Sequence, residues 1–63
     1  VEYLTLYRIE KASRKLINSD MSVTSVAFSC GFNDLSYFIK TFKQLKGITP
    51  ARFRKQSLYS SEV

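Results

Sequence analysis

Residues 31–47, GFNDLSYFIKTFKQLKG, carry apolar side chains at helical spacing between two glycines. Successive residues of an α-helix are turned by about 100°, so side chains three or four positions apart share a face. The apolar stripe consists of Leu35, Phe38, Phe42 and Leu45, and the opposite stripe consists of Ser36, Lys40 and Lys43. This pattern predicts a helix over residues 34–46 with its phenylalanines inward and its lysines outward. Asn33 or Asp34 would cap its start, and Gly47 would end it.

A shorter helix is predicted just before this one. Ser22 is a good N-cap, and apolar residues then repeat at i, i+3, i+4 and i+7, namely Val23, Val26, Ala27 and Cys30. Gly31 is expected to end the helix with a positive φ. Phe28 falls on the opposite face, where it would either meet a missing neighbour or stay half exposed. Two short helices joined by a tight turn that contains glycine predict a helix-turn-helix over residues 22–46.

The first segment, residues 1–18, is predicted to be a helix that is apolar on more than one side. Its inward face would hold Leu6, Ile9, Ala12 and Leu16, and its opposite face Arg8, Lys11, Arg14 and Lys15. In its first half, Tyr3, Leu4, Leu6 and Tyr7 point in nearly every direction around the axis. A helix that is apolar all round is normally buried on all sides. We therefore expect a neighbour that this chain lacks, and the missing initiator Met agrees with a chain cut from a longer protein.

A last helix is predicted over residues 49–57. Thr49 would be its N-cap and Pro50 its first helical residue. Phe53 is expected to pack inward, with Arg52, Arg54 and Lys55 at the surface. Residues 58–63, LYSSEV, are expected to form a frayed tail. The chain as a whole is thus predicted to be one small all-α domain of roughly four helices, covering residues 1–57.

The charge balance points to a polyanionic partner. Ten Lys and Arg residues against five Asp and Glu give a net charge of +5 and a pI near 9.7. Nucleic acid is the favoured partner, and an anionic membrane surface is the rival. No apolar run approaches the ~20 residues that span a bilayer, so no membrane insertion is expected.

Composition argues against catalysis. Histidine is absent and Cys30 is the single cysteine, so Cys/His zinc sites, Ser/His or Cys/His nucleophilic pairs and imidazole acid–base chemistry are excluded. The five carboxylates are scattered, and no glycine-rich phosphate loop is present. We predict no enzyme activity, no metal and no cofactor. Cys30 is expected to be a small buried apolar residue, and the lack of a possible disulfide within the chain fits a reducing cytosol.

The stretch GFNDLSYFIKTFKQLKGITPARFR resembles the signature of AraC/XylS-type transcription regulators, approximately G-F-x-D-x-S-Y-F-x-[RK]-x-F-K-x-x-x-G-x-[TS]-P-x-x-[YF]-R. That family's connecting helix is resembled at Tyr3, Leu4, Arg8, Ile9, Ala12 and Leu16. The start of its second helix-turn-helix is resembled at Asp20, Met21, Ser22, Val23, Val26 and Ala27. Two departures are Ser25, where many members carry Glu, and Lys15, where an apolar residue is common. Neither lies in the signature helix. The resemblance covers nearly the whole chain, but only the second of the family's two helix-turn-helix units.

The resemblance implies sequence-specific binding to double-stranded promoter DNA and control of transcription, usually as an activator that also contacts RNA polymerase. It implies a bacterial, cytoplasmic and nucleoid-associated protein. Any dimerisation would use a domain absent from this chain.

Candidate DNA contacts follow from the helix-turn-helix, whose second helix lies in the major groove. The base-facing candidates are Ser36, Lys40, Leu35 and Ile39, although Leu35 is at least equally suited to the core. The phosphate candidates are Lys43, Tyr37, Ser22, Thr49, Arg52 and Arg54. For Tyr37, packing at the helix edge is an equal alternative, and for Arg52 and Arg54 so are surface ion pairs. On composition alone, a helical module that binds protein or membrane without DNA specificity remains the alternative function.

Overall fold

The computed structural model describes the backbone of residues 2–60 and the side chains of residues 2–57, and this part of the chain folds into helices without any strand. The helices are α1 (Tyr3–Asn18), α2 (Val23–Ser29), α3 (Leu35–Lys46) and α4 (Pro50–Ser60). The predicted all-α class and the order of the four predicted helices are therefore confirmed.

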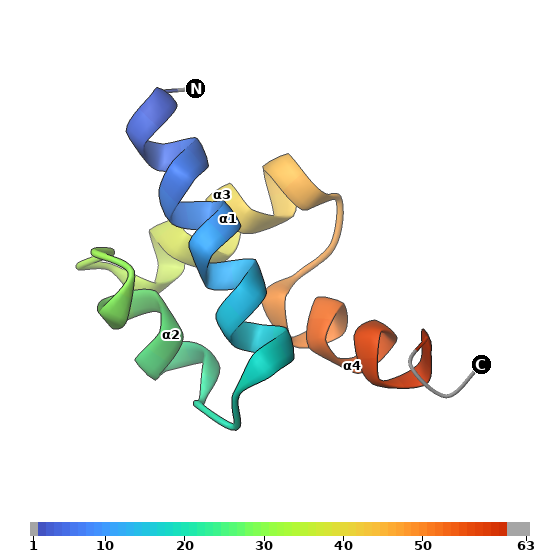
Figure 1. Ribbon diagram of the computed structural model, residues 1–63. Coiled ribbons are helices and arrows are strands. Elements are labelled where there is room, and N and C mark those ends of the chain that lie inside the picture. Colours follow the sequence, from blue (N-terminus) through green and yellow to red (C-terminus); the bar gives the residue numbers. More distant parts are fainter. Residues whose placement is uncertain (1, 61–63) are drawn as a thin grey trace.

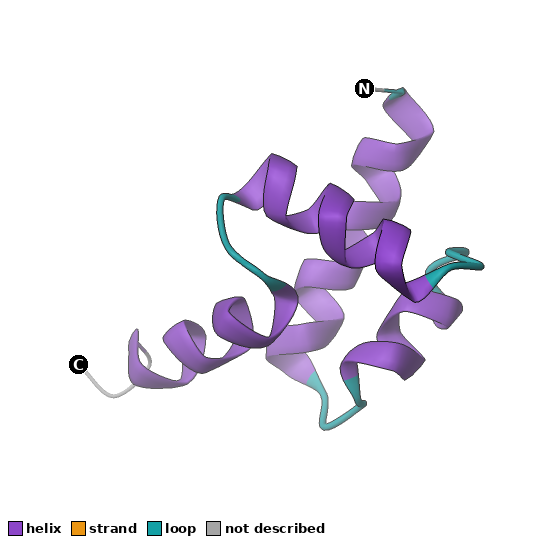
Figure 2. Cartoon of the chain, turned by 180° about the vertical axis from the view of Figure 1, so that it is seen from behind, coloured by secondary structure: helices purple, strands orange, loops and turns teal. Residues whose placement is uncertain are grey.

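The helices form two layers. In Figure 1, α1 crosses in front of α3, and below this crossing α2 and α4 lie to the left and right of the C-terminal half of α1. Figure 2 shows the molecule from behind, and there α3 lies nearer to the viewer than α1. The outer side of α3 and the outer side of α1 therefore belong to opposite faces of the molecule.

The core fills the space between the two layers. Its buried apolar side chains are Ile9, Ala12, Leu16, Val26, Ala27, Cys30, Phe32, Phe38 and Phe42. Phe38 and Phe42 are completely buried, and Leu35 and Leu45 pack against the core while half-buried. The inward stripe predicted for α3, and the buried position predicted for Cys30, are therefore confirmed.

Four phenylalanines run through the core as a continuous chain of ring contacts. The centroids of Phe32 and Phe38 lie 5.0 Å apart, those of Phe38 and Phe42 5.8 Å, and those of Phe42 and Phe53 5.3 Å. Tilted and edge-to-face ring pairs of this kind each add about 0.5–1.5 kcal/mol beyond the burial of their area. The chain of rings joins the α2–α3 turn, α3 and α4 into one unit.

The starts of α2 and α3 and the end of α2 are capped by the predicted residues. The Ser22 hydroxyl accepts a hydrogen bond from the Ser25 N–H (3.0 Å), and the Asp34 carboxylate accepts from the N–H groups of Ser36 and Tyr37. Gly31 follows α2 with φ +94°. The Phe32 N–H donates to the Ala27 carbonyl (3.0 Å), and the Gly31 N–H to the Phe28 carbonyl (3.2 Å). These two bonds make a Schellman motif, which satisfies carbonyls that the end of a helix leaves free.

The buried stripe of α1 differs from the prediction at one position. Leu6 is 40% exposed, whereas Thr5 is buried in line with Ile9, Ala12 and Leu16. The N-terminal half of α1 extends past the other helices (Figure 1), and the described residues provide nothing that covers the Leu6 side. Tyr3, Leu4 and Tyr7 are exposed as well, so the first half of α1 presents apolar surface on several sides.

The last helix is longer than predicted. It runs to Ser60, whereas the prediction ended it at residue 57 and began a frayed tail at residue 58. The sequence from Ala51 to Ser60 contains neither Gly nor Pro, so no residue there breaks the helix. The rest of the predicted tail, residues 61–63, lies outside the described residues.

Candidate nucleic-acid interface

The outer side of α3 presents an exposed polar stripe. Ser36, Lys40 and Lys43 are exposed, whereas Phe38 and Phe42 on the inner side are buried completely. Because both phenylalanines are fixed in the core, rotation of α3 about its axis is blocked. The stripe therefore keeps one orientation relative to the domain.

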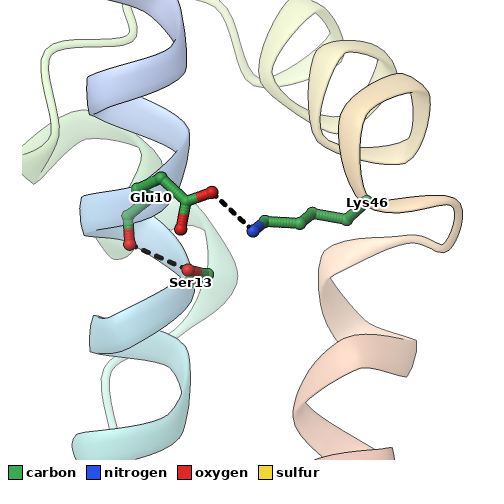
Figure 3. Close-up of polar contacts among 3 residues, drawn as sticks. All are labelled: Glu10, Ser13 and Lys46. Atoms are coloured by element: carbon green, nitrogen blue, oxygen red, sulfur yellow. Dashed lines mark hydrogen bonds and ion pairs between the residues drawn. The ribbon is translucent and has the colours of Figure 1, made fainter.

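One lysine of α3 is not free. The Lys46 ammonium lies 2.7 Å from the Glu10 carboxylate of α1, and the Ser13 hydroxyl donates to the Glu10 carbonyl (2.8 Å), as Figure 3 shows. This ion pair offsets the charge of Lys46 and connects the end of α3 with α1. Within the described part of the chain, Lys40 and Lys43 have no acidic partner within 4.0 Å. These two residues are the cations that α3 offers to a ligand.

Leu35 and Ile39 do not belong to the exposed stripe. Both are half-buried and pack against the core, at its edge. Of the four base-facing candidates, the structure thus brings Ser36 and Lys40 together on the outer side and turns Leu35 and Ile39 toward the core.

Tyr37 lies where the polar stripe meets the α2–α3 turn. Its ring is 6.1 Å from the Phe32 ring at an angle of 47°, and half of the residue (53%) is exposed. Its packing against the helix edge is thus present, and its hydroxyl has no hydrogen-bond partner among the described residues.

The hydroxyls of Ser22 and Thr49 are used inside the chain. Ser22 accepts from the Ser25 N–H and donates to the Ser25 hydroxyl (3.1 Å), and Thr49 accepts from the Arg52 N–H (3.3 Å). Both residues are N-caps as predicted. A phosphate at either helix end would meet main-chain N–H groups of the first turn, where the helix dipole favours an anion.

The two arginines of α4 have different surroundings. Arg52 is exposed, whereas Arg54 is half-buried and donates to three main-chain carbonyls, those of Leu16, Ser19 and Met21. The expected surface position of Arg54 is therefore wrong. The sequence did contain the signal, because residues 50, 53, 54 and 57 share one face of a helix, so Arg54 lies beside Phe53 on the inner side.

A groove borders the polar stripe. It has a volume of about 380 Å³, and it is lined by Glu2, Thr5, Tyr37, Lys40, Thr41 and Gln44. The groove therefore lies between the start of α1 and the outer side of α3, and Lys40 is one of the residues that line it. Sequence periodicity had not placed Glu2 or Thr5 near Lys40, because periodicity gives no information about contacts between the start of α1 and α3.

Within the part of the chain that the structure describes, neither a metal site nor a membrane-spanning helix is present. No group of three or more Cys, Asp or Glu side chains is placed to hold a metal ion. None of the helices is long and apolar enough to cross a membrane.

Comparison with known proteins gives a consistent result. A family model described as a helix-turn-helix domain matches residues 1–56. The chain is 37% identical over 57 residues to YdeC of Bacillus subtilis, an uncharacterized HTH-type transcriptional regulator, and the match covers 90% of the chain and 20% of that protein. It is 39% identical to AdaA of the same species, a bifunctional transcriptional activator and DNA repair enzyme (90% of the chain, 27% of AdaA).

A third relative comes from another species. The HTH-type transcriptional regulator GadX of Escherichia coli is 34% identical over 56 residues, which cover 89% of the chain and 20% of GadX. The chain thus spans about a fifth to a quarter of the length of these three relatives. No solved structure matches it significantly.

Proposed function

Because the chain belongs to the AraC-type helix-turn-helix family of transcriptional regulators, we propose that it binds promoter DNA with α3 in the major groove. The observation that carries this proposal is the exposed stripe of Ser36, Lys40 and Lys43 on a helix whose opposite side is locked into the core. A helix-turn-helix places its second helix in the groove, and α3 is that helix.

Base reading is assigned to Ser36 and Lys40. They are four residues apart, so they lie one above the other on the first two turns of α3, the part of a recognition helix that reaches base edges. The Lys40 ammonium can donate to O6 and N7 of guanine, and a hydroxyl can donate to or accept from several bases. Leu35 and Ile39, at the edge of the core, have a packing role in this proposal.

Phosphate binding is assigned to residues around this stripe. Lys43 lies further along α3, and Tyr37 has a hydroxyl without a partner among the described residues. Arg52 and the N-termini of α2 and α4, capped by Ser22 and Thr49, complete the set. These contacts would fix the register of α3 on the duplex without selecting a sequence.

Activation of transcription is proposed by analogy alone. AdaA is named as a transcriptional activator, and so is FapR of Escherichia coli, which is 41% identical over 46 residues. An activator would also contact RNA polymerase.

Selection of preferred sequences from random duplexes by the full-length protein tests the function. We expect one enriched motif that contains guanine opposite Lys40. Titrating the enriched duplex at several salt concentrations should show that the logarithm of the binding constant falls linearly with the logarithm of the salt concentration, with a slope of about −0.9 for each phosphate that a cationic side chain neutralises. Vesicles of anionic lipid at the same ionic strengths serve as the control.

Two results would contradict the proposal. One is a pool that remains random after selection, and the other is binding to vesicles as tight as binding to duplex DNA. The second result would favour a helical module that recognises anionic surfaces in general.

A further inference from the structure

The C-terminal end of α1 lacks the glycine that ends α2 and α3. After Asn18 the chain turns directly into an extended residue, Ser19 (φ −144°, ψ 167°). The last carbonyls of any helix have no partner within the helix. The Ser19 N–H and hydroxyl both donate to the Lys15 carbonyl, at 3.1 and 2.7 Å. The carbonyls that follow need donors from elsewhere in the molecule.

Arg54 of α4 donates to one of the last carbonyls of α1 and to two carbonyls of the loop that follows it. Its Nε–H donates to the Leu16 carbonyl (2.9 Å), and its Nη2 group donates to the carbonyls of Ser19 (3.3 Å) and Met21. A cation at this end of a helix also meets the negative pole of the helix dipole. Three of the five N–H donors of the guanidinium are thus used by the corner between α1 and α2.

The neighbouring residue of α4 faces the reading helix. Phe53 packs edge-on against Phe42, with ring centroids 5.3 Å apart and an interplanar angle of 73°. Phe42 is fully buried on the inner side of α3. Two adjacent residues of α4 therefore connect the α1–α2 corner, through Arg54, with α3, through Phe53.

We propose that Arg54 is a positioning residue that sets the angle between α2 and α3. By fixing the α1–α2 corner against α4, it holds α2 in place relative to the helix that reads the bases, and so it contributes to base selection without touching DNA. The inference rests on the proposed function for its effect on DNA, but its geometric basis is independent of that function. It replaces the phosphate role that the sequence had suggested for this residue.

The experiment uses two substitutions at Arg54 and the same two at Arg52. Arg54→Lys keeps the charge but loses the planar fork, because an ammonium is a single donor centre. Arg54→Met removes the charge as well. Arg52 is the matched control, since it lies on the same helix and is exposed. Each variant of the full-length protein is assayed at a temperature where circular dichroism shows it to be folded, with the enriched duplex and a scrambled duplex at several salt concentrations.

Positioning and phosphate binding predict different results. If Arg54 positions the helices, both Arg54 variants should bind the enriched duplex less selectively. The ratio of the affinity for the enriched duplex to that for the scrambled duplex should fall by about tenfold, the loss expected for one misaligned base contact. The dependence of the affinity on salt should not change. Arg52→Met should instead weaken both duplexes alike and make the slope shallower by about 0.9, and Arg52→Lys should restore it. An Arg54→Lys variant that binds like the wild type, combined with a shallower slope for Arg54→Met, would overturn the inference in favour of a phosphate contact.

A second measurement does not depend on DNA. The Nε–H of Arg54 should give a slowly exchanging signal in NMR spectra of the folded protein, because it is bonded to a carbonyl at the end of a helix. Exchange as fast as that of Arg52 would overturn the contact itself. Wild-type protein without any sequence preference would overturn the proposed function and the role in base selection, while a protected Nε–H would still support the corner contact.

Discussion

At the scale of single residues, one side of α3 packs in the core and the other side is exposed. Phe38 and Phe42 are completely buried and hold the helix in place, while Ser36 and Lys40 stand in solvent on the other side. A reading helix needs both conditions, because a side chain can select a base only if its backbone is held in register. Substitutions on the two sides should therefore have separable effects on stability and on base preference.

Phe42→Ala tests the inner side. The residue is fully buried and contacts the rings of Phe38 and Phe53, so its truncation should cost about 3–5 kcal/mol. Phe28→Ala is the matched control, because Phe28 is 52% exposed and should cost far less. Urea or thermal unfolding followed by circular dichroism measures both. Cooperative melting of Phe42→Ala at the wild-type temperature would show that the inner stripe is wrongly assigned.

Lys40→Ala tests the outer side. Loss of a base contact should relax the preference at one base pair by about 1–3 kcal/mol and leave the other positions unchanged. Lys43→Ala, which removes a proposed phosphate contact, should weaken all duplexes alike. Lys11→Ala removes the same charge from the opposite layer of the molecule and is expected to change neither property. Competition among single-base variants of the enriched duplex gives the comparison, and an unchanged profile for Lys40→Ala would remove its role in the groove.

At the scale of helices, the sequence predicted those boundaries that are set by local chemistry. Asp34, Ser22 and Thr49 cap helices through bonds to their own first turns, and Gly31 and Gly47 end helices with positive φ. Each of these effects spans at most a few residues, so pattern and residue type were sufficient.

Contacts between residues far apart in the sequence were not predicted. The first predicted helix, residues 1–18, ends at the same residue as α1, Asn18, but the partner that completes this end was missed. The end of α1 is completed by Arg54, which lies 38 residues after Leu16, and sequence periodicity gives no information about which carbonyls an arginine will reach. The exposure of Leu6 likewise depends on how far α1 extends beyond its neighbours. The outward position of Ser36 and Lys40 was predicted because it follows from the same periodicity as the core stripe.

The two terminating glycines provide a prediction for this scale. A Cβ at Gly31 would lie 3.0 Å from Nε of Arg8, whereas a Cβ at Gly47 would meet nothing within 4 Å. Both substitutions place an Ala in a left-handed conformation, which costs about 1–2 kcal/mol. Gly31→Ala also requires the end of the Arg8 side chain to shift by a few tenths of an ångström. We expect Gly31→Ala to be the more destabilising in urea unfolding.

A double-mutant cycle isolates the contribution of Arg8. In an Arg8→Ala background the side chain next to the new Cβ is absent. The two glycine substitutions should then lower the free energy of unfolding by the same amount. A difference that persists in this background would place the extra cost in the α2–α3 turn itself.

At the scale of the whole molecule, the start of α1 is an apolar surface that the described residues leave uncovered. Tyr3 is 85% exposed and Tyr7 55%, and Leu4 and Leu6 lie beside them. The resemblance to the AraC/XylS type implies a second helix-turn-helix upstream, which would cover this surface and add a second reading helix. Two tethered contacts can raise avidity by about 10²–10⁴.

We therefore expect upstream residues to raise specific affinity and melting temperature together. Residues 1–63 alone should retain mainly non-specific binding, with a dissociation constant of about 10⁻⁴–10⁻⁶ M at physiological salt. Calorimetry and titration with the enriched duplex, on the 63-residue chain and on the full-length protein, measure both quantities. Equal affinity of the two for that duplex would refute the idea that this chain is one half of a two-part reader.

The contact of Arg54 with the end of α1 also has a consequence for biosynthesis. The α1–α2 corner is complete at residue 21, but the side chain that fixes it is made 33 residues later, after the reading helix itself. At roughly 5–20 residues per second, a ribosome needs ~2–7 s for that interval. A chain that ends between α3 and residue 54 would carry the lysines of α3. It would lack Arg54, the residue that we propose orients this helix. Such a product would be expected to bind DNA through its charge while having lost much of its ability to choose among sequences.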